Sequence, residues 1–223
     1  IYLNPQGWAV LSEVAPRERW TKLLEYAIDR LATPYGLRLL TPPYQEFDPY
    51  LGRISAELPG VYENGATYNH AAAFFLQALL KAGMTAHAWE YCKRILPDSQ
   101  ANPSDRSGAE PFVLTNCIFT GEAGRRAGTS YFGWYTGTAA WIIRLVHNGF
   151  SGFWPDYDGL HVRPEHIPAE IGLREVRRLY RGTEYRMTVQ SKSPKRVVVN
   201  GKDWNSPDPL PLRQGGRVDV RLE

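Results

Sequence analysis

The chain has 223 residues, of which 43% are hydrophobic and 22% charged, a composition typical of globular proteins. Its net charge of +3 is small and it has no run rich in Lys and Arg, so we expect no nucleic-acid partner. No apolar stretch approaches the roughly 18 residues that a membrane-spanning helix needs, so we expect no membrane partner either.

The first two thirds of the chain are predicted to be helical. Apolar residues recur at helical spacing in five segments: residues 4–15, 17–33, 70–83, 86–95 and 136–148. Pro5 fits the first turn of the first helix, because an N–H there would have no intrahelical partner. Thr85 is the expected N-cap of the fourth helix.

Two long segments between these helices, residues 33–60 and 97–110, are rich in Pro and Gly. Loops of such length in a compact domain are commonly functional. The first loop also carries aromatic residues, a composition that argues against disorder. We expect it to form one wall of a site.

From about residue 155 onward, apolar and polar residues alternate as they do in strands. Asn200-Gly201 follows Val197–Val199 directly, which is a strong signal for a β-hairpin. A β-rich domain is therefore predicted after the helical one.

Cysteine and aromatic content narrow the class of protein. Cys92 and Cys117 offer no disulfide framework and no zinc-ligand spacing, so we expect a reducing, cytoplasmic setting and no bound metal. The 7 Trp, 13 Tyr and 8 Phe are numerous, and many lie in segments rich in turn-forming residues. Such a mixture suits a carbohydrate cleft, while core packing is the alternative for any single ring. The chain begins at Ile1 without an initiator Met, and we expect a piece of a longer polypeptide.

Thr136-Gly137-Thr138 lies where an aromatic loop becomes an apolar helix. A threonine there can cap the helix, and the free N–H groups and dipole of a helix N-terminus attract an anion. Gly137 would let an anion approach the backbone, because glycine has no Cβ. Capping alone is the simpler interpretation of so short a motif.

The segment YENGATYNH, residues 62–70, places Glu63 and His70 just before an apolar helix. In the first helical turn, His70 can donate a hydrogen bond to an anion that the helix end also attracts. Glu63 would repel that anion, but its carboxylate can accept hydrogen bonds from sugar hydroxyls. A polar helix entry with a buried histidine is the alternative. Together the two anion-binding candidates suggest a reaction that uses phosphate, and the aromatic loops suggest a sugar.

Several motifs, in this order, resemble the C-terminal part of the inverting disaccharide phosphorylases. They are YLNPQGWAVLS, TPYGLRLLTPPY, DPYLGRI, PGVYENGATYNHA, EPF, TGTAAW and PDYDGLHVRP. That family includes cellobiose, cellodextrin, laminaribiose, cellobionic acid and chitobiose phosphorylases. The similarity extends over nearly the whole chain.

The resemblance implies a mainly α part followed by a β part. Residues 1–154 would form the C-terminal helices of an (α/α)6 catalytic barrel, and residues 155–223 a C-terminal β-sandwich of jelly-roll type. The remaining helices and an N-terminal β-sandwich would come from the upstream part of the same polypeptide. Members of the family are usually homodimers, so a homodimer is also implied.

The family cleaves a β-glycosidic bond with inorganic phosphate as co-substrate, without a cofactor, and forms an α-sugar-1-phosphate with inversion. By resemblance, His70, Thr136 and Gly137 bind phosphate, and Asn116 is a further phosphate-binding candidate. The general-acid Asp of the family lies upstream of Ile1. The chain is therefore expected to hold no catalytic residue and to be inactive alone.

The sugar side departs from the family pattern. Glu63 and Tyr62 are the sugar-binding candidates, but several members have a basic residue where this chain has Tyr62. The acceptor therefore stays open among glucose, gluconate and N-acetylglucosamine, with a β-linked glucosyl disaccharide such as cellobiose or laminaribiose as the expectation and cellobionate as the main competitor. Arg125 and Arg126 could bind an anionic acceptor, although we expect them on a solvated loop.

Two other functions stay open at this point. An inverting glycoside hydrolase on the same helical toroid would need a water-activating carboxylate where phosphate otherwise binds. A non-catalytic carbohydrate-binding fragment would need no phosphate site. The imidazole of His70 and the Thr136-Gly137 pair suit an anion, which favours the phosphorylase.

Overall fold

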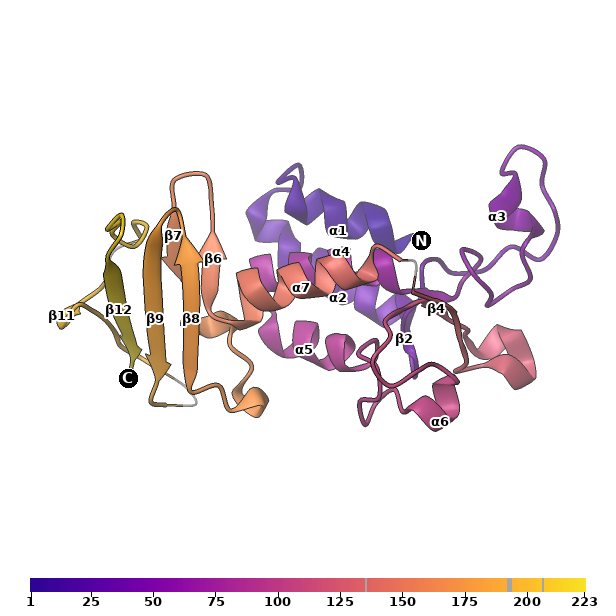
Figure 1. Ribbon diagram of the computed structural model, residues 1–223. Helices are drawn as coiled ribbons and strands as arrows, with labels where there is room; N and C mark the ends of the chain where they lie inside the picture. The colour runs from indigo at the N-terminus through magenta and orange to yellow at the C-terminus, as the bar shows by residue number, and fades with distance from the viewer. Residues whose placement is uncertain (135, 192–193, 206) are drawn as a thin grey trace. The chain divides into compact units, whose positions relative to one another are not determined.

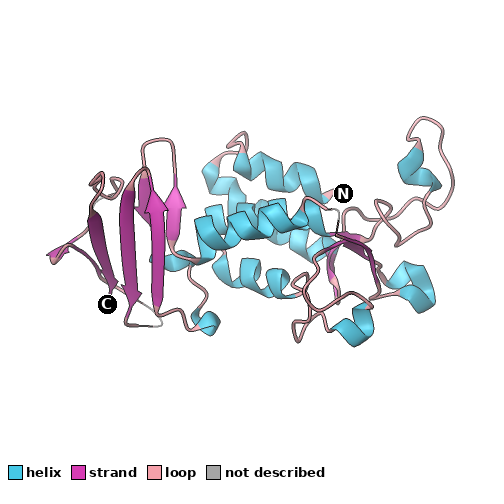
Figure 2. Ribbon diagram, viewed as in Figure 1, coloured by secondary structure: helices cyan, strands magenta, loops and turns pink. Residues whose placement is uncertain are grey.

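The computed structural model divides into two compact units, Ile1–Ile143 and Arg144–Glu223 (Figure 1). The structure describes residues 1–134, 136–191, 194–205 and 207–223. The first unit is mainly helical and carries small sheets, and the second is mainly β (Figure 2). A mainly α part followed by a β part is thus confirmed. The described residues form no closed barrel, and a boundary at residues 154 and 155 stays a prediction.

The five predicted helices are present. They are α1 (Leu3–Leu11), α2 (Trp20–Leu31), α4 (Asn69–Lys81), α5 (Thr85–Lys93) and α7 (Thr138–Leu145), with the short α3 (Arg53–Ala56) and α6 (Ser104–Ser107) in the loops. The first unit packs around α4, which contacts both α1 and α5 and is buried along most of its length. No helix of the described ranges is long and apolar enough to cross a membrane.

Two helix ends differ from the prediction. Thr85 is the first residue of α5 and Met84 precedes it as N-cap, so the expectation that Thr85 caps this helix is wrong. The reason is that Thr85 is buried in the first turn instead of standing before it. The last predicted helix is shorter than expected, because a π-helical turn, Val146–Phe150, follows α7.

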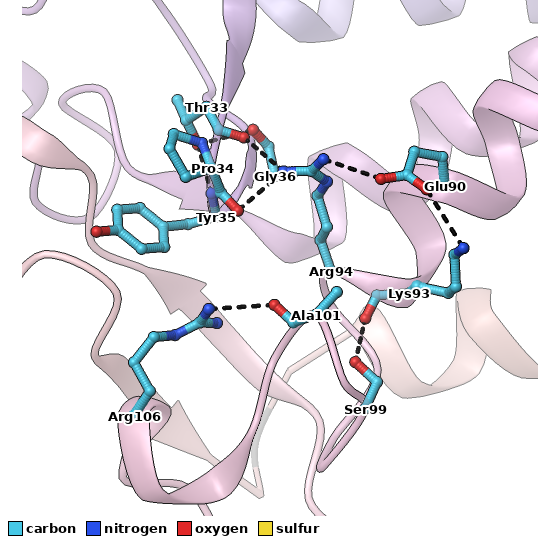
Figure 3. Close-up of polar contacts among 10 residues, drawn as sticks. All are labelled: Thr33, Pro34, Tyr35, Gly36, Glu90, Lys93, Arg94, Ser99, Ala101 and Arg106. Carbon is cyan, nitrogen blue, oxygen red and sulfur yellow. Dashed lines mark hydrogen bonds and ion pairs between the residues drawn. The ribbon is translucent and has the colours of Figure 1, made fainter.

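The two long loops are ordered by polar contacts with α5 (Figure 3). Arg94, which follows α5, donates hydrogen bonds to the carbonyl oxygens of Thr33 and Pro34 at 3.1 and 2.9 Å. From the second loop, the Arg106 guanidinium lies over the Tyr35 ring at 5.3 Å from its centroid. Both loops therefore pack on the helical core and on each other.

Asn64 fixes the far end of the first loop. Its Oδ1 accepts a hydrogen bond from the Tyr44 N–H at 2.8 Å. Its Nδ2 donates to the carbonyl oxygens of Tyr44 at 2.9 Å and Glu57 at 2.7 Å. Asn64 is completely buried, and it supplies these partly buried backbone groups with hydrogen-bond partners. The middle residue of the Glu-Asn-Gly motif is therefore structural.

A three-stranded antiparallel sheet gathers segments that are far apart in the sequence. It consists of β3 (Thr67–Tyr68), β4 (Thr115–Ile118) and β5 (Ser130–Gly133), with β4 in the centre. In its register, Tyr68 pairs with Cys117, and Cys117 pairs with Tyr131. Since β3 runs directly into α4 and β5 lies shortly before α7, the sheet fixes the entrance of both helices.

The second unit is built on a five-stranded sheet in the order β11-β10-β12-β9-β8. Its strands are β8 (Glu175–Tyr180), β9 (Thr183–Val189), β10 (Val197–Val199), β11 (Lys202–Asp203) and β12 (Arg217–Leu222), and the separate hairpin is β6 (Phe153–Pro155) with β7 (Leu160–Val162). Strands β12 and β9 are parallel, and the other pairs are antiparallel. The hairpin predicted at Asn200-Gly201 is confirmed, with positive φ at both residues.

The core of this unit lies between the large sheet and the β6–β7 hairpin. Phe153 and Leu160 of the hairpin pack with Tyr185 and Met187 of β9, and all four are at most 1% exposed. Two β layers therefore enclose one apolar core. The jelly-roll arrangement of these layers stays a prediction.

Candidate functional site

His70 and Gly137 lie in direct contact. His70 is in the first turn of α4 and half-buried, and Gly137 immediately precedes α7. A Cβ built on Gly137 would lie 2.6 Å from His70 Nε2 and 2.8 Å from Nδ1, which is too close for real atoms. Only glycine at position 137 lets the imidazole rest against the start of α7. The structure thus brings together two of the predicted phosphate-binding residues.

Burial changes the proton affinity of His70. Desolvation lowers the pKa of its imidazole below the ordinary value of 6.5. The ring is therefore neutral near pH 7 in the absence of a ligand. An anion bound beside it would raise that pKa again, since an opposite charge favours the imidazolium form.

Thr136 caps the entrance of α7. Its Oγ1 accepts a hydrogen bond from the Thr138 N–H at 3.2 Å and lies 2.7 Å from Thr138 Oγ1. The carbonyl of Gly137 accepts the bond from Trp141 N–H, so Thr136 stands one residue before the helix boundary. Thr136 thus accepts a bond from an N–H of the first helical turn, as predicted, but from one residue outside the N-cap position, and its anion-binding role stays a prediction.

A buried polar network, which the sequence analysis did not find, joins the entrances of α4 and α7. Asn69 Nδ2 donates to the Thr115 carbonyl at 2.9 Å, and Thr138 Oγ1 donates to the same oxygen at 3.4 Å. Asn69 and Thr138 are completely buried. The only signal in the sequence was their position, Asn69 before His70 and Thr138 after Gly137. Their bonds hold the two helix entrances in register.

Asn116 is the residue after Thr115 on β4. Its Nδ2 lies 3.4 Å from the Tyr68 hydroxyl, a weak hydrogen bond. The half-buried Asn116 therefore belongs to the strand that connects the two helix entrances, one residue from Thr115. Its predicted contact to phosphate stays a prediction.

Tyr62 is part of an aromatic cluster at the edge of the same sheet. Its ring lies 5.6 Å from Phe119, 5.2 Å from Tyr131 and 5.6 Å from Phe132, centroid to centroid. Burial, followed by the hydrogen bond with Tyr131, raises the pKa of Tyr62 to about 12. Tyr62 also has a φ of 45°, an unusual conformation for an aromatic residue. Packing thus accounts for this side chain, and its sugar contact stays a prediction.

Glu63 is half-buried beside this cluster. Burial, with the Glu63 charge as the next cause, raises the pKa of the Cys117 thiol to about 12. Cys117 is therefore a protonated, unreactive thiol near neutral pH. Arg125 and Arg126 lie exposed in the 3-10 turn Gly121–Arg126, as expected of a solvated loop.

An exposed aromatic pair close to Thr136 was also not predicted as a site. Trp134 is 72% exposed and Phe112 is 71% exposed, with ring centroids 6.0 Å apart. The indole N–H of Trp134 donates to Glu110 Oε1 at 3.2 Å. Among the described residues, no group of three or more His, Cys, Asp or Glu side chains is placed to hold a metal ion.

Comparison with known proteins gives the family. The catalytic-domain model of the glycosyl hydrolase 94 superfamily matches residues 1–152. Solabiose phosphorylase from Paenibacillus borealis is 42% identical over 208 residues, and cellobionic acid phosphorylase from Neurospora crassa is 32% identical over 213 residues. These matches cover 91% and 94% of this chain but 27% of either relative, so the chain spans a little over a quarter of their length. As its motifs predicted, the chain belongs to the glycosyl hydrolase 94 superfamily.

Proposed function

We propose that this chain is part of a disaccharide phosphorylase, which reversibly cleaves a β-linked glucosyl disaccharide with inorganic phosphate. The relatives are named as phosphorylases, which supports this activity, although each name states a different substrate. The upstream part of the same polypeptide would complete an (α/α)6 barrel with residues 1–154, while residues 155–223 would form the β-sandwich. A cytoplasmic homodimer without cofactor or metal belongs to the same proposal.

The observation that carries the proposal is the contact between His70 and Gly137. It puts an imidazole, a threonine hydroxyl and the N-terminal ends of α4 and α7 in one place. Helix N-termini carry partial positive charge and bind anions through their free backbone N–H groups. A phosphate there would contact His70, Thr136 and Gly137, with Asn116 as a further contact.

In the proposed reaction, a phosphate oxygen bonds to the anomeric carbon while the bond from that carbon to the glycosidic oxygen breaks. The leaving oxygen takes its proton from a general acid that we assign to the polypeptide outside this chain. No residue here acts as a base, because phosphate is already an anion. Glu63 and Tyr62 would contact the sugars, with the glucosyl identity of the substrate as part of the proposal.

The test uses the full-length polypeptide and a His70→Ala variant. Loss of a charge-assisted hydrogen bond is expected to raise the KM for phosphate roughly 10- to 100-fold, with a much smaller change in the KM for the disaccharide. His87→Ala is the matched control, because His87 is an exposed histidine of α5. An unchanged phosphate KM in the His70 variant would show that His70 does not bind phosphate. Sugar release without phosphate would favour a hydrolase.

A further inference from the structure

Ring packing holds His70 in the part of the chain that the structure describes. Functional histidines are commonly oriented by an acceptor that binds one ring nitrogen. Among the described residues, none forms a hydrogen bond with either ring nitrogen of His70. In the described structure, the orientation of the ring therefore comes from the surfaces around it.

Three helices supply those surfaces. Phe74, one turn after His70 on α4, has its ring centroid 4.6 Å from the imidazole, and Trp141 of α7 lies 6.5 Å from it. Phe74 and Trp141 are 4.5 Å apart in an edge-to-face arrangement. The ring of Trp8 of α1 packs against both, with its centroid 5.2 Å from that of Phe74 and 6.3 Å from that of Trp141. We call Trp8, Phe74 and Trp141 the aromatic triad.

We propose that Phe74 and Trp141 are positioning residues for His70. This proposal rests on the proposed function, in which His70 binds phosphate. With Gly137 against the same imidazole, the aromatic triad restricts the rotation of a ring that no described residue holds by a hydrogen bond. A ring already oriented loses less conformational entropy when the anion binds. The Phe74 ring, 4.6 Å from the imidazole and tilted by 54°, is close enough to stabilise the imidazolium that forms beside the anion.

Phe74 and its neighbour Phe75 provide a matched pair for the test. Phe75 is completely buried, and its backbone packs against Gly7 on the side of α1. Phe74 is half-buried and contacts His70. In the full-length polypeptide, Phe74→Leu and Phe75→Leu remove the same ring from the same helix. Phosphate affinity is measured with inorganic phosphate alone, as a thermal shift, and again as KM in turnover.

Phe74→Leu is expected to weaken phosphate binding about three- to tenfold, the equivalent of one aromatic contact, and to leave the disaccharide KM unchanged. Phe75→Leu is expected to lower the Tm more, because its ring is more deeply buried, yet to change phosphate affinity less than about twofold. If Phe74 had only a structural role, phosphate affinity would follow stability, and Phe75→Leu would lower it more than Phe74→Leu. Phosphate affinity that falls equally in both variants would overturn the proposal.

The His70→Ala variant distinguishes phosphate binding by His70 from the positioning of His70 by Phe74. If it loses phosphate affinity while Phe74→Leu does not, the positioning role is wrong and the proposed function stands. If His70→Ala binds phosphate normally, both are wrong. Phe74→Met, which keeps apolar volume without a ring, replaces Phe74→Leu should that variant fail to fold.

Discussion

Gly137 lies against the imidazole of His70, and this contact explains why glycine occupies position 137. The sequence suggested that the missing Cβ makes room for an anion. The structure assigns the same space to the His70 ring, since a Cβ would overlap both ring nitrogens. In the proposed site, the glycine therefore acts on phosphate through the histidine as well as through its own backbone.

A Gly137→Ala variant tests this relationship. The methyl group would push the imidazole away from α7, and overpacking of this kind costs about 1–3 kcal/mol. We expect the phosphate KM to rise roughly 5- to 100-fold. Gly121→Ala is the control, because a Cβ at Gly121 meets no atom within 4 Å. Equal kinetics for the two variants would show that the His70 ring does not depend on Gly137.

Phosphate binding is expected to depend on pH through His70. Burial lowers the pKa of the free imidazole below 6.5, and a bound anion raises it. Between these two pKa values, binding takes up a proton, so affinity falls as pH rises, by up to about tenfold per pH unit. The rings of Phe74 and Trp141 and the backbone of Gly137, which contact the imidazole, do not titrate in this range.

The measurement is the phosphate dissociation constant as a function of pH. A window from about pH 5.5 to about pH 8 brackets the ordinary His pKa of about 6.5. A His70→Asn variant serves as reference. Phosphate titrates identically in both experiments, so the ratio of the two constants isolates the imidazole. A ratio that does not change with pH would mean that His70 stays neutral in the complex.

Two variants of Thr136 distinguish its hydrogen bond to the helix from binding of a ligand. Thr136→Val removes the hydroxyl that accepts the Thr138 N–H, and loss of such a cap destabilises by about 1 kcal/mol. Thr136→Ser keeps the hydroxyl and is expected to retain the Tm. If Thr136 also binds phosphate, the Val variant raises the phosphate KM and the Ser variant does not. A Val variant with lower Tm and normal phosphate KM would restrict Thr136 to capping.

Asn64 is expected to matter for order in the first long loop. Asn64→Ala removes the side-chain partners of partly buried backbone groups of Tyr44 and Glu57, at about 1 kcal/mol for each bond. Hydrogen exchange at Tyr44 and proteolysis within residues 45–57 should both accelerate. Asn102→Ala, which removes bonds to Leu96 and Arg106, is the comparison and should leave exchange at Tyr44 and cleavage within residues 45–57 unchanged. An unchanged cleavage pattern in Asn64→Ala would refute the structural role.

Much of the fold was predictable because its signals are local. The periodicity of α2 and α4 and the Asn200-Gly201 turn each lie within a few neighbouring residues. The sheet of β3, β4 and β5 was not predicted, since strands of two to four residues carry almost no alternation. Its pairing joins segments that only tertiary structure brings together.

The candidate site was predictable residue by residue but not as an arrangement. Resemblance pointed to His70, Thr136 and Gly137, yet nothing local connects positions 70 and 137. The aromatic triad was equally hidden, because Trp8, Phe74 and Trp141 each fit an ordinary apolar helix face. Thr85 failed as a predicted N-cap for a similar reason: its burial depends on distant packing.

The most direct test of the account is sugar-1-phosphate release by the full-length polypeptide, with and without phosphate. The substrates would be cellobiose, laminaribiose, cellobionate, chitobiose and solabiose. The account predicts release that requires phosphate, with a phosphate KM that rises in His70→Ala and stays unchanged in His87→Ala. Release of free sugar in the absence of phosphate, at the same rate in all three proteins, would contradict it.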